Sequence, residues 1–248
     1  MARRLFYARI ECGGRAIVDG DTAVHMRRVL RVETGQKYEL SDGERLYLAQ
    51  ISGFARDNVE FRILEELPAR REGARIVLYA ALVKFDRFEW IIEKATELGV
   101  SRLVPIAAAR SEAGLEKAAL KRHARWSRIA EESGQQCRRL RAMAIDTPMD
   151  FAATLRTTHA LRFMLDENCG SPLLDCLQAG SGEIAVLTGP EGGWTPEERA
   201  NALAAGWTPA TLGEQVLRAE TAALAALSQI QGWWWAKTLQ LPATEDRP

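Results

Sequence analysis

The hydrophobic pattern of this chain changes near residue 70, and that change constrains the fold more than any other feature. Before it, short β-forming runs are separated by turn residues and lie at 5–8, 37–40, 45–51 and 58–64. After it, residues 76–83 form a continuous apolar run, which is typical of a strand buried on both faces. Because the polar segment 66–73 contains Pro68, we expect a domain boundary there.

The region before this boundary has the pattern of a small β domain. Asp42-Gly43 lies between two of the β-forming runs and is a good hairpin signal. One short helix fits between the strands, from Thr22 to Val29. Several short strands with close turns are typical of a small barrel, so we expect a β-barrel domain over residues 1–70.

The region after the boundary alternates predicted strands with predicted helices. Strands are expected at 76–83, 102–107, 160–165 and 183–188, and helices at about 115–138, 196–205 and 217–237. Asp86-x-x-Glu89 resembles a capping box that opens a further helix, and Gly99 lies where a C-cap glycine belongs. This alternation predicts an α/β domain with a mostly parallel sheet.

The composition excludes several classes of protein. The chain has 248 residues, 47% hydrophobic and 27% charged, which argues against a disordered, collagen-like or low-complexity protein. No apolar stretch approaches the ~18 residues of a membrane-spanning helix, and the arginine-rich N-terminus lacks the apolar core of a secretory signal. We therefore expect a soluble, cytoplasmic protein with no membrane association. The four cysteines have no metal-ligand spacing, so we expect buried or incidental thiols and no metal site.

Two basic stretches stand out in a chain whose formal net charge is zero. Residues 1–31 contain seven arginines against three acids, and residues 121–141 contain seven basic residues against two acids. The guanidinium fork of arginine matches phosphate in bidentate geometry, so both stretches are candidates for nucleic-acid contact. A solvated surface explains the same charges, and from charge alone the two interpretations stay open.

Two glycine-containing loops carry the strongest signal of a binding site. Residues 188–193 (TGPEGG) follow a predicted buried strand, and residues 211–222 (TLGEQVLRAETA) repeat the arrangement before the last helix. Ligands of open α/β sheets bind beyond the carboxyl ends of strands, where glycine lets the backbone approach closely. A tight turn explains the first loop equally well, and Arg218 and Glu220 can equally be charges at a helix end.

These loops resemble the two C-terminal signatures of the RsmE-type methyltransferases, a family of the SPOUT superfamily. Further motifs similar to those of the family occur in order along the chain: HMRRVLR at 25–31, KATELGV at 94–100 with Pro105, and W…IA…QQCR over 126–138. Three positions depart from the family pattern, with Gln215 in place of arginine, Ala219 in place of threonine and Gln135 in place of glutamate.

The resemblance implies an activity and an architecture. Its members use S-adenosyl-L-methionine to methylate N3 of a uridine in 16S rRNA of the small ribosomal subunit. It implies a PUA-like β-barrel RNA-binding domain over 1–70 and an α/β methyltransferase domain over 74–240, with a C-terminal trefoil knot and a homodimer through the second domain. Two alternatives stay open: another SPOUT RNA methyltransferase, acting on tRNA or a ribose 2′-hydroxyl, and a catalytically silent RNA-binding ribosome-assembly factor.

The resemblance also assigns candidate residues to three roles. Arg218 and Glu220 are the catalytic candidates, because N3 of uridine must lose a proton and the site needs a base or a cation that stabilises the anion. The cofactor candidates lie in the two loops and are Leu187, Thr188, Gly189, Pro190, Glu191, Gly192, Gly193, Leu212, Gly213, Val216, Leu217 and Thr221. The RNA-binding candidates are Arg3, Arg4, His25, Arg28, Arg31, Lys84, Arg87, Arg125 and Arg138, and for His25 a structural role is the alternative.

Overall fold

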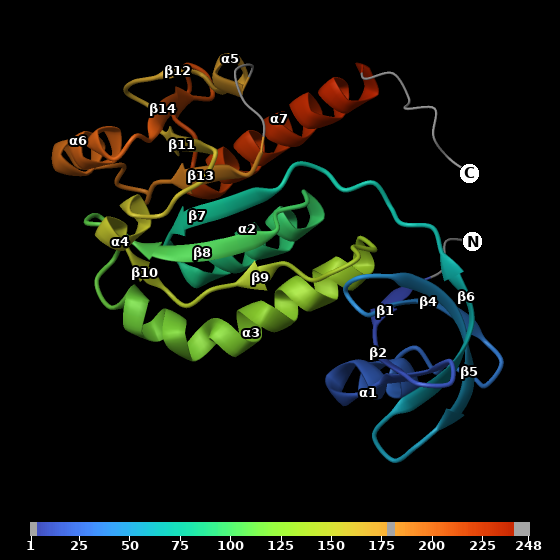
Figure 1. The fold of residues 1–248 in the computed structure, drawn as a ribbon. Coiled ribbons are helices and arrows are strands. Elements are labelled where there is room, and N and C mark those ends of the chain that lie inside the picture. Colours follow the sequence, from blue (N-terminus) through green and yellow to red (C-terminus); the bar gives the residue numbers. More distant parts are fainter. Residues whose placement is uncertain (1–3, 178–181, 241–248) are drawn as a thin grey trace. The chain divides into compact units, whose positions relative to one another are not determined.

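The computed structural model describes residues 4–177 and 182–240, which form two compact units (Figure 1). Of the described residues, the first unit combines 4–71 with 131–142. The second unit contains 72–130, 143–177 and 182–240. The first unit is built around an antiparallel-rich sheet and the second around a parallel one, so the change of hydrophobic pattern near residue 70 marks a change of fold.

Six strands form the curled, barrel-like sheet of the first unit, in the order β1-β4-β5-β6-β3-β2. They are β1 (Leu5–Tyr7), β2 (Arg9–Glu11), β3 (Arg15–Val18), β4 (Lys37–Ser41), β5 (Leu46–Phe54) and β6 (Val59–Leu67), with helix α1 (Gly20–Arg28) between β3 and β4. The four predicted strands, the Asp42-Gly43 hairpin and the helix are confirmed. Strands β2 and β3 were not predicted; Gly13 and Gly14, at φ +81° and +75°, connect them in a hairpin.

Residues 131–142 join the first unit through buried polar contacts. The carboxylate of Glu39, which is 8% exposed, accepts hydrogen bonds from the guanidinium groups of Arg70 and Arg138. The hydroxyl of Ser41 donates a hydrogen bond to the carbonyl of Leu140. A second, distant segment of the chain is therefore part of this unit.

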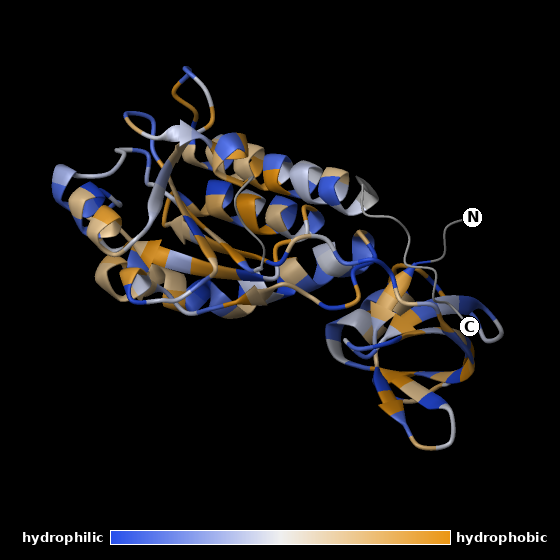
Figure 2. Ribbon diagram, turned by 45° about the horizontal axis from the view of Figure 1, so that its top comes forward, coloured by the Kyte–Doolittle hydropathy of each residue, from blue (hydrophilic) through white to orange (hydrophobic). Residues whose placement is uncertain are grey.

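Eight strands form the sheet of the second unit, and every pair in it is parallel. The order is β10-β8-β7-β13-β11-β14-β12, with β9 beside β8. The strands are β7 (Ile76–Ala81), β8 (Arg102–Ala107), β9 (Ala144–Ile145), β10 (Met149–Asp150), β11 (Leu161–Leu165), β12 (Ser171–Pro172), β13 (Ile184–Thr188) and β14 (Thr208–Thr211). The predicted strands are confirmed, and Figure 2 shows the strands of this sheet largely in the orange of hydrophobic residues.

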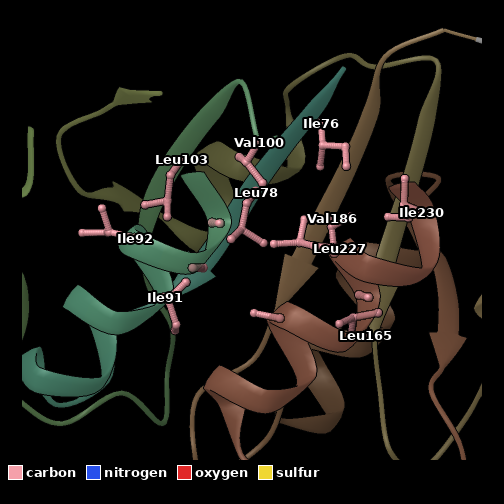
Figure 3. Packing of buried hydrophobic residues seen from close by; sticks show 14 of the residues in the cluster. Ile76, Leu78, Ile91, Ile92, Val100, Leu103, Leu165, Val186, Leu227 and Ile230 are labelled. Atoms are coloured by element: carbon pink, nitrogen blue, oxygen red, sulfur yellow. The ribbon is translucent and has the colours of Figure 1, made fainter. Parts of the chain in front are cut away.

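Helices cover both faces of this sheet. They are α2 (Phe85–Glu97), α3 (Leu115–Gln136), α4 (Phe151–Leu155), α5 (Leu173–Leu177), α6 (Pro196–Ala204) and α7 (Ala219–Gln240). Alternate residues of β7 enter two separate cores: Leu78 packs with residues of α2 and α7 (Figure 3), whereas Tyr79 packs with residues of α4 and α6. Burial on both faces explains why the apolar run at 76–83 is continuous.

The start of α2 differs from the prediction. The helix begins at Phe85 with Lys84 as its N-cap, and no side chain caps it, so the predicted capping box at Asp86 and Glu89 is wrong. Glu89 instead accepts hydrogen bonds from Arg122 and Arg125 of α3. At the other end of the helix, the predicted C-cap glycine is confirmed. Gly99 directly follows the C-cap residue Leu98 and has a φ of +85°.

The four cysteines are free thiols, and of the two expected alternatives, buried or incidental, the buried one is wrong. Cys12 and Cys169 are exposed, and Cys137 and Cys176 are partly exposed. Within residues 4–177 and 182–240, no helix has both the length and the apolar character needed to cross a bilayer.

Candidate active site

A cavity of about 390 Å³ lies at the carboxyl edge of the parallel sheet. Its wall comes from the segments that follow three neighbouring strands, β11, β13 and β14, together with Arg87 of α2 and the start of α7. This volume falls within the range of roughly 300–1,000 Å³ that small-molecule sites occupy. The cavity therefore lies where ligands of open α/β sheets bind.

The two glycine-containing loops meet at this cavity. Eight of the twelve cofactor candidates line it: Gly189, Pro190, Glu191, Gly193, Leu212, Gly213, Val216 and Leu217. The other four lie off the wall. Leu187 and Thr188 are 0% and 2% exposed, and the side chain of Leu187 packs in the core on the α6 face of the sheet. Gly192 packs against Arg110, and Thr221 is exposed on α7.

Packing fixes the shape of the first loop. A Cβ on Gly189 would lie 3.0 Å from the ring of Trp194, which is itself 2% exposed and donates an Nε1 hydrogen bond to the Leu165 carbonyl at 2.9 Å. The Arg110 guanidinium donates to the Gly192 carbonyl at 2.8 Å. Only glycine fits at residue 189 without displacing the indole ring, so packing against Trp194 determines the path of the loop backbone.

A capping box anchors the exit of the first loop. Thr195 accepts a hydrogen bond from the backbone N–H of Glu198 at 3.1 Å, and Glu198 accepts one from the N–H of Thr195 at 2.9 Å. The second carboxylate oxygen of Glu198 accepts from the N–H of Ala109 at 2.8 Å, which ties α6 to the end of β8. The predicted helix start at residue 196 is confirmed, with Thr195 as its N-cap.

The second loop leaves its side chains open to solvent. Gly213 has φ +141°, which L side chains rarely adopt, and Thr211 donates a hydrogen bond to the Gly213 carbonyl at 3.1 Å. Val216 is 76% exposed although it lines the cavity. Helix α7 begins at Ala219, two residues later than predicted, so Arg218 precedes the helix instead of lying in its first turn.

Sequence reasoning missed a buried ion pair beside the cavity. Asp166 directly follows β11, and its side chain is 1% exposed. The Arg199 guanidinium donates to it from Nε at 2.5 Å and from Nη2 at 3.3 Å. Burial by itself would raise the pKa of Asp166, but the hydrogen bonds from Arg199 and from the Asn168 N–H outweigh burial and hold that pKa below its usual value. An acid directly after a predicted strand was the available signal for this site.

Three arginines line the cavity, and they differ in their partners. Arg199 is paired with Asp166, and Arg87 is paired with Glu191 of the first loop. The guanidinium of Arg218 has no hydrogen bond or ion pair with any residue in the described part of the chain. Arg218 is therefore the wall cation that is free to meet a substrate.

Glu220 lies behind the wall of the cavity. Glu220 is 9% exposed, and the Nε of Arg87 lies 3.8 Å from its Oε1. Among the described residues, Glu220 has no ion pair with Arg218, so it does not orient that guanidinium. Its Oε2 is buried and has no hydrogen-bond partner among the described residues. Neither oxygen of this carboxylate is on the cavity wall.

The RNA-binding candidates differ in exposure and in their partners. The exposed ones are Arg4, His25, Arg28, Arg31, Lys84 and Arg125, and Arg125 also donates hydrogen bonds to Glu89. Arg138 directs its guanidinium group to Glu39, and Arg87 lines the cavity. Arg3 lies outside the described residues. Within the residues that the structure describes, no group of three His, Cys, Asp or Glu side chains could hold a metal ion.

Known proteins are similar to this chain in sequence and in fold. Residues 70–231 match the family model described as the RNA methyltransferase domain. The chain is similar to the ribosomal RNA small subunit methyltransferase E of Synechocystis sp., with 32% identity over 83% of this chain and 69% of that protein. The protein of the same name from Mycobacterium bovis is 31% identical over 93% of this chain and 92% of its own length. The crystal structure of the Neisseria gonorrhoeae protein of that name, bound to S-adenosyl methionine, is similar with a TM-score of 0.83 and 29% identity, covering 94% of this chain and 98% of that one.

Proposed function

The chain belongs to the ribosomal RNA small subunit methyltransferase E family of RNA methyltransferases, and from that premise we propose its reaction. We propose that it transfers a methyl group from S-adenosyl-L-methionine to N3 of a uridine in 16S rRNA of the small ribosomal subunit. The observation that carries the proposal is the cavity formed by the two glycine-containing loops, with the unpaired Arg218 on its wall.

The cavity fits the methyl donor in size and chemistry. Leu165, Leu212 and Leu217 supply apolar surface for the adenine ring, as small-molecule sites usually do. Backbone N–H and C=O groups of Gly189, Gly193, Leu212, Gly213 and Leu217, which line the cavity, would hydrogen-bond the adenine and the ribose. When bound, S-adenosylmethionine supplies an activated methyl group, so the task of the protein is to hold donor and acceptor in line.

Arg218 supplies the electrostatic part of the mechanism. N3 of uridine is a poor nucleophile until it loses its proton, which passes to solvent in this mechanism, and the resulting negative charge spreads onto the uracil carbonyl oxygens. A guanidinium placed to hydrogen-bond one of these oxygens stabilises that anion in the transition state. The Glu220 carboxylate, buried behind the wall, holds Arg87 near the first loop, and we assign the direct contact with the base to Arg218.

Family membership supports four further features of this proposal. The barrel-like first unit acts as a PUA-like RNA-binding domain, and the second unit carries a C-terminal trefoil knot. The protein forms a homodimer through the second unit and works in the cytoplasm, where ribosomal subunits are assembled. Gel filtration with light scattering tests the dimer, for which we expect twice the 27.6 kDa of one chain.

Transfer of a labelled methyl group separates the proposed reaction from its alternatives. The protein is incubated with methyl-labelled S-adenosylmethionine and small ribosomal subunits that lack the modification. Label recovered as N3-methyluridine from 16S rRNA supports the proposal. Label in tRNA or at a ribose 2′-hydroxyl favours another SPOUT activity, and no label with retained RNA binding favours a silent assembly factor.

The exposed basic residues of the first unit are expected to bind RNA phosphates. A double variant, Arg28→Ala with Arg31→Ala, should weaken RNA binding and reduce the slope of log affinity against log salt by about one to two. The slope falls because binding with fewer phosphate contacts releases fewer counterions. Fluorescence anisotropy with a 16S rRNA fragment measures this slope.

The control for this variant is Arg15→Ala. Arg15 is in the same unit, but its guanidinium already faces Glu60 at 3.4 Å. This variant should keep the wild-type slope. A double variant whose slope equals that of the wild type would show that RNA is bound elsewhere.

A further inference from the structure

Glu167 is the unpaired acid on the wall of the cavity. Three acids line the cavity, and two of them are already neutralised, Asp166 by Arg199 and Glu191 by Arg87. The carboxylate of Glu167 has no hydrogen bond or ion pair with any residue in the described ranges, and its side chain is exposed.

Glu167 is held against the loop that we propose to bind the cofactor. It lies two residues beyond the end of β11, whose neighbour in the sheet, β13, leads into that loop. Its Oε1 is 3.4 Å from the position that a Cβ on Gly193 would occupy. Because Gly193 has no side chain, the carboxylate lies directly beside the loop backbone and faces the same cavity.

The charge on the wall indicates what this carboxylate binds. With Asp166 and Glu191 paired, the wall charges that have no ion pair among the described residues are the cation of Arg218 and the anion of Glu167. Glu167 also interacts electrostatically with Arg199, but that guanidinium is already bonded to Asp166. A ligand hydroxyl can be satisfied by a loop carbonyl, but a full cation in a partly enclosed site needs an anion that is not already neutralised. An ammonium group has N–H donors for a charge-assisted hydrogen bond, whereas a sulfonium has none.

We propose, resting on the proposed function, that Glu167 is a specificity-determining residue that binds the α-ammonium group of the methionine moiety of the methyl donor. The α-ammonium is present in both the donor and its demethylated product. Glu167 therefore distinguishes amino-acid-bearing nucleosides from nucleosides that lack this group.

Calorimetric titration of three ligands tests this assignment. The ligands are S-adenosylmethionine, S-adenosylhomocysteine and 5′-methylthioadenosine, which has the adenosine but no amino acid. In Glu167→Gln we expect the affinity for the first two to fall by about tenfold or more, as for loss of a hydrogen bond between charged groups, and the affinity for methylthioadenosine to stay unchanged. The control Glu214→Gln removes an exposed acid of the second loop that is off the wall, and it should bind all three like the wild type.

Each other outcome overturns the assignment. Equal loss for all three ligands points to a ribose contact, loss for S-adenosylmethionine alone points to the sulfonium, and no loss shows that Glu167 does not touch the ligand. In all three cases the wild type still binds the donor, so the proposed function stands. A wild-type protein that binds none of the ligands overturns both.

Discussion

Replacing Arg218 with alanine is expected to reduce the rate of methyl transfer by about 100- to 1,000-fold, the loss typical of removing one preorganised donor to a developing anion. Arg218 lines the cavity, and no residue in the described part of the chain pairs with its guanidinium. The variant therefore breaks no internal contact of that side chain, and the fold and the affinity for S-adenosylmethionine should stay close to wild type.

Single-turnover transfer to undermodified small subunits at saturating donor measures this effect. Circular dichroism and donor titration of the same variant check the fold and the cofactor site. Arg218→Lys is the matched variant, since it keeps the charge without the planar fork, and it should retain more activity than the alanine variant. An alanine variant that turns over at the wild-type rate would refute the role of Arg218.

Replacing Arg199 with alanine is expected to lower the free energy of unfolding of the second unit by about 3–5 kcal/mol, the usual cost of breaking a buried ion pair. The change leaves the carboxylate of Asp166, with a side chain that is 1% exposed, without its counter-ion. Urea unfolding at pH 7 followed by tryptophan fluorescence measures the loss.

An exposed ion pair of the same unit provides the control. Arg75 faces Glu183 at 3.7 Å with its side chain 74% exposed. Arg75→Ala should cost less than about 1 kcal/mol, as is usual for surface pairs. Equal losses for the two variants would mean that burial of Asp166 contributes nothing.

The pH dependence of the Arg199 effect gives a second readout. Despite burial, the hydrogen bond from Arg199 holds the pKa of Asp166 below its usual value. A carboxyl of this kind contributes stability above the unfolded-state pKa of about 3.9, and that contribution is lost as the pH falls through the folded-state pKa. The difference between wild type and Arg199→Ala should therefore be large at pH 7 and shrink below about pH 4. A difference that stays constant over this range would contradict the assignment.

The features that could be predicted are those that local sequence encodes. Strands β7 and β13 are buried on both faces, so each is a continuous apolar run that no surface element would show. The loops that follow strands β13 and β14 are marked by glycines. At Gly189 the Trp194 ring leaves no room for a side chain, and at Gly213 the φ of +141° favours glycine. Their position at the carboxyl edge of the sheet follows from parallel strand order.

The features that could not be predicted depend on pairing between distant residues. Arg87, expected to contact RNA, instead pairs with Glu191, which is 104 residues away in the chain. The pairing of Arg138 with Glu39 and of Arg199 with Asp166 likewise depends on tertiary structure alone. Strands of two residues, such as β9 and β10, are too short to show a hydrophobic periodicity. Asp86 and Glu89 have the spacing of a capping box, but α2 already begins at Phe85, so Asp86 cannot be its N-cap.

The proposed mechanism depends on one cavity, between residues 189–193 and 212–217, holding the methyl donor beside Arg218. A crystal structure of the protein grown with S-adenosylmethionine tests it most directly. We expect the donor in that cavity, its adenine against the apolar wall and its methyl group directed toward the side where Arg218 lies. A donor bound at another place on the chain, or a methyl group directed away from Arg218, would contradict the account.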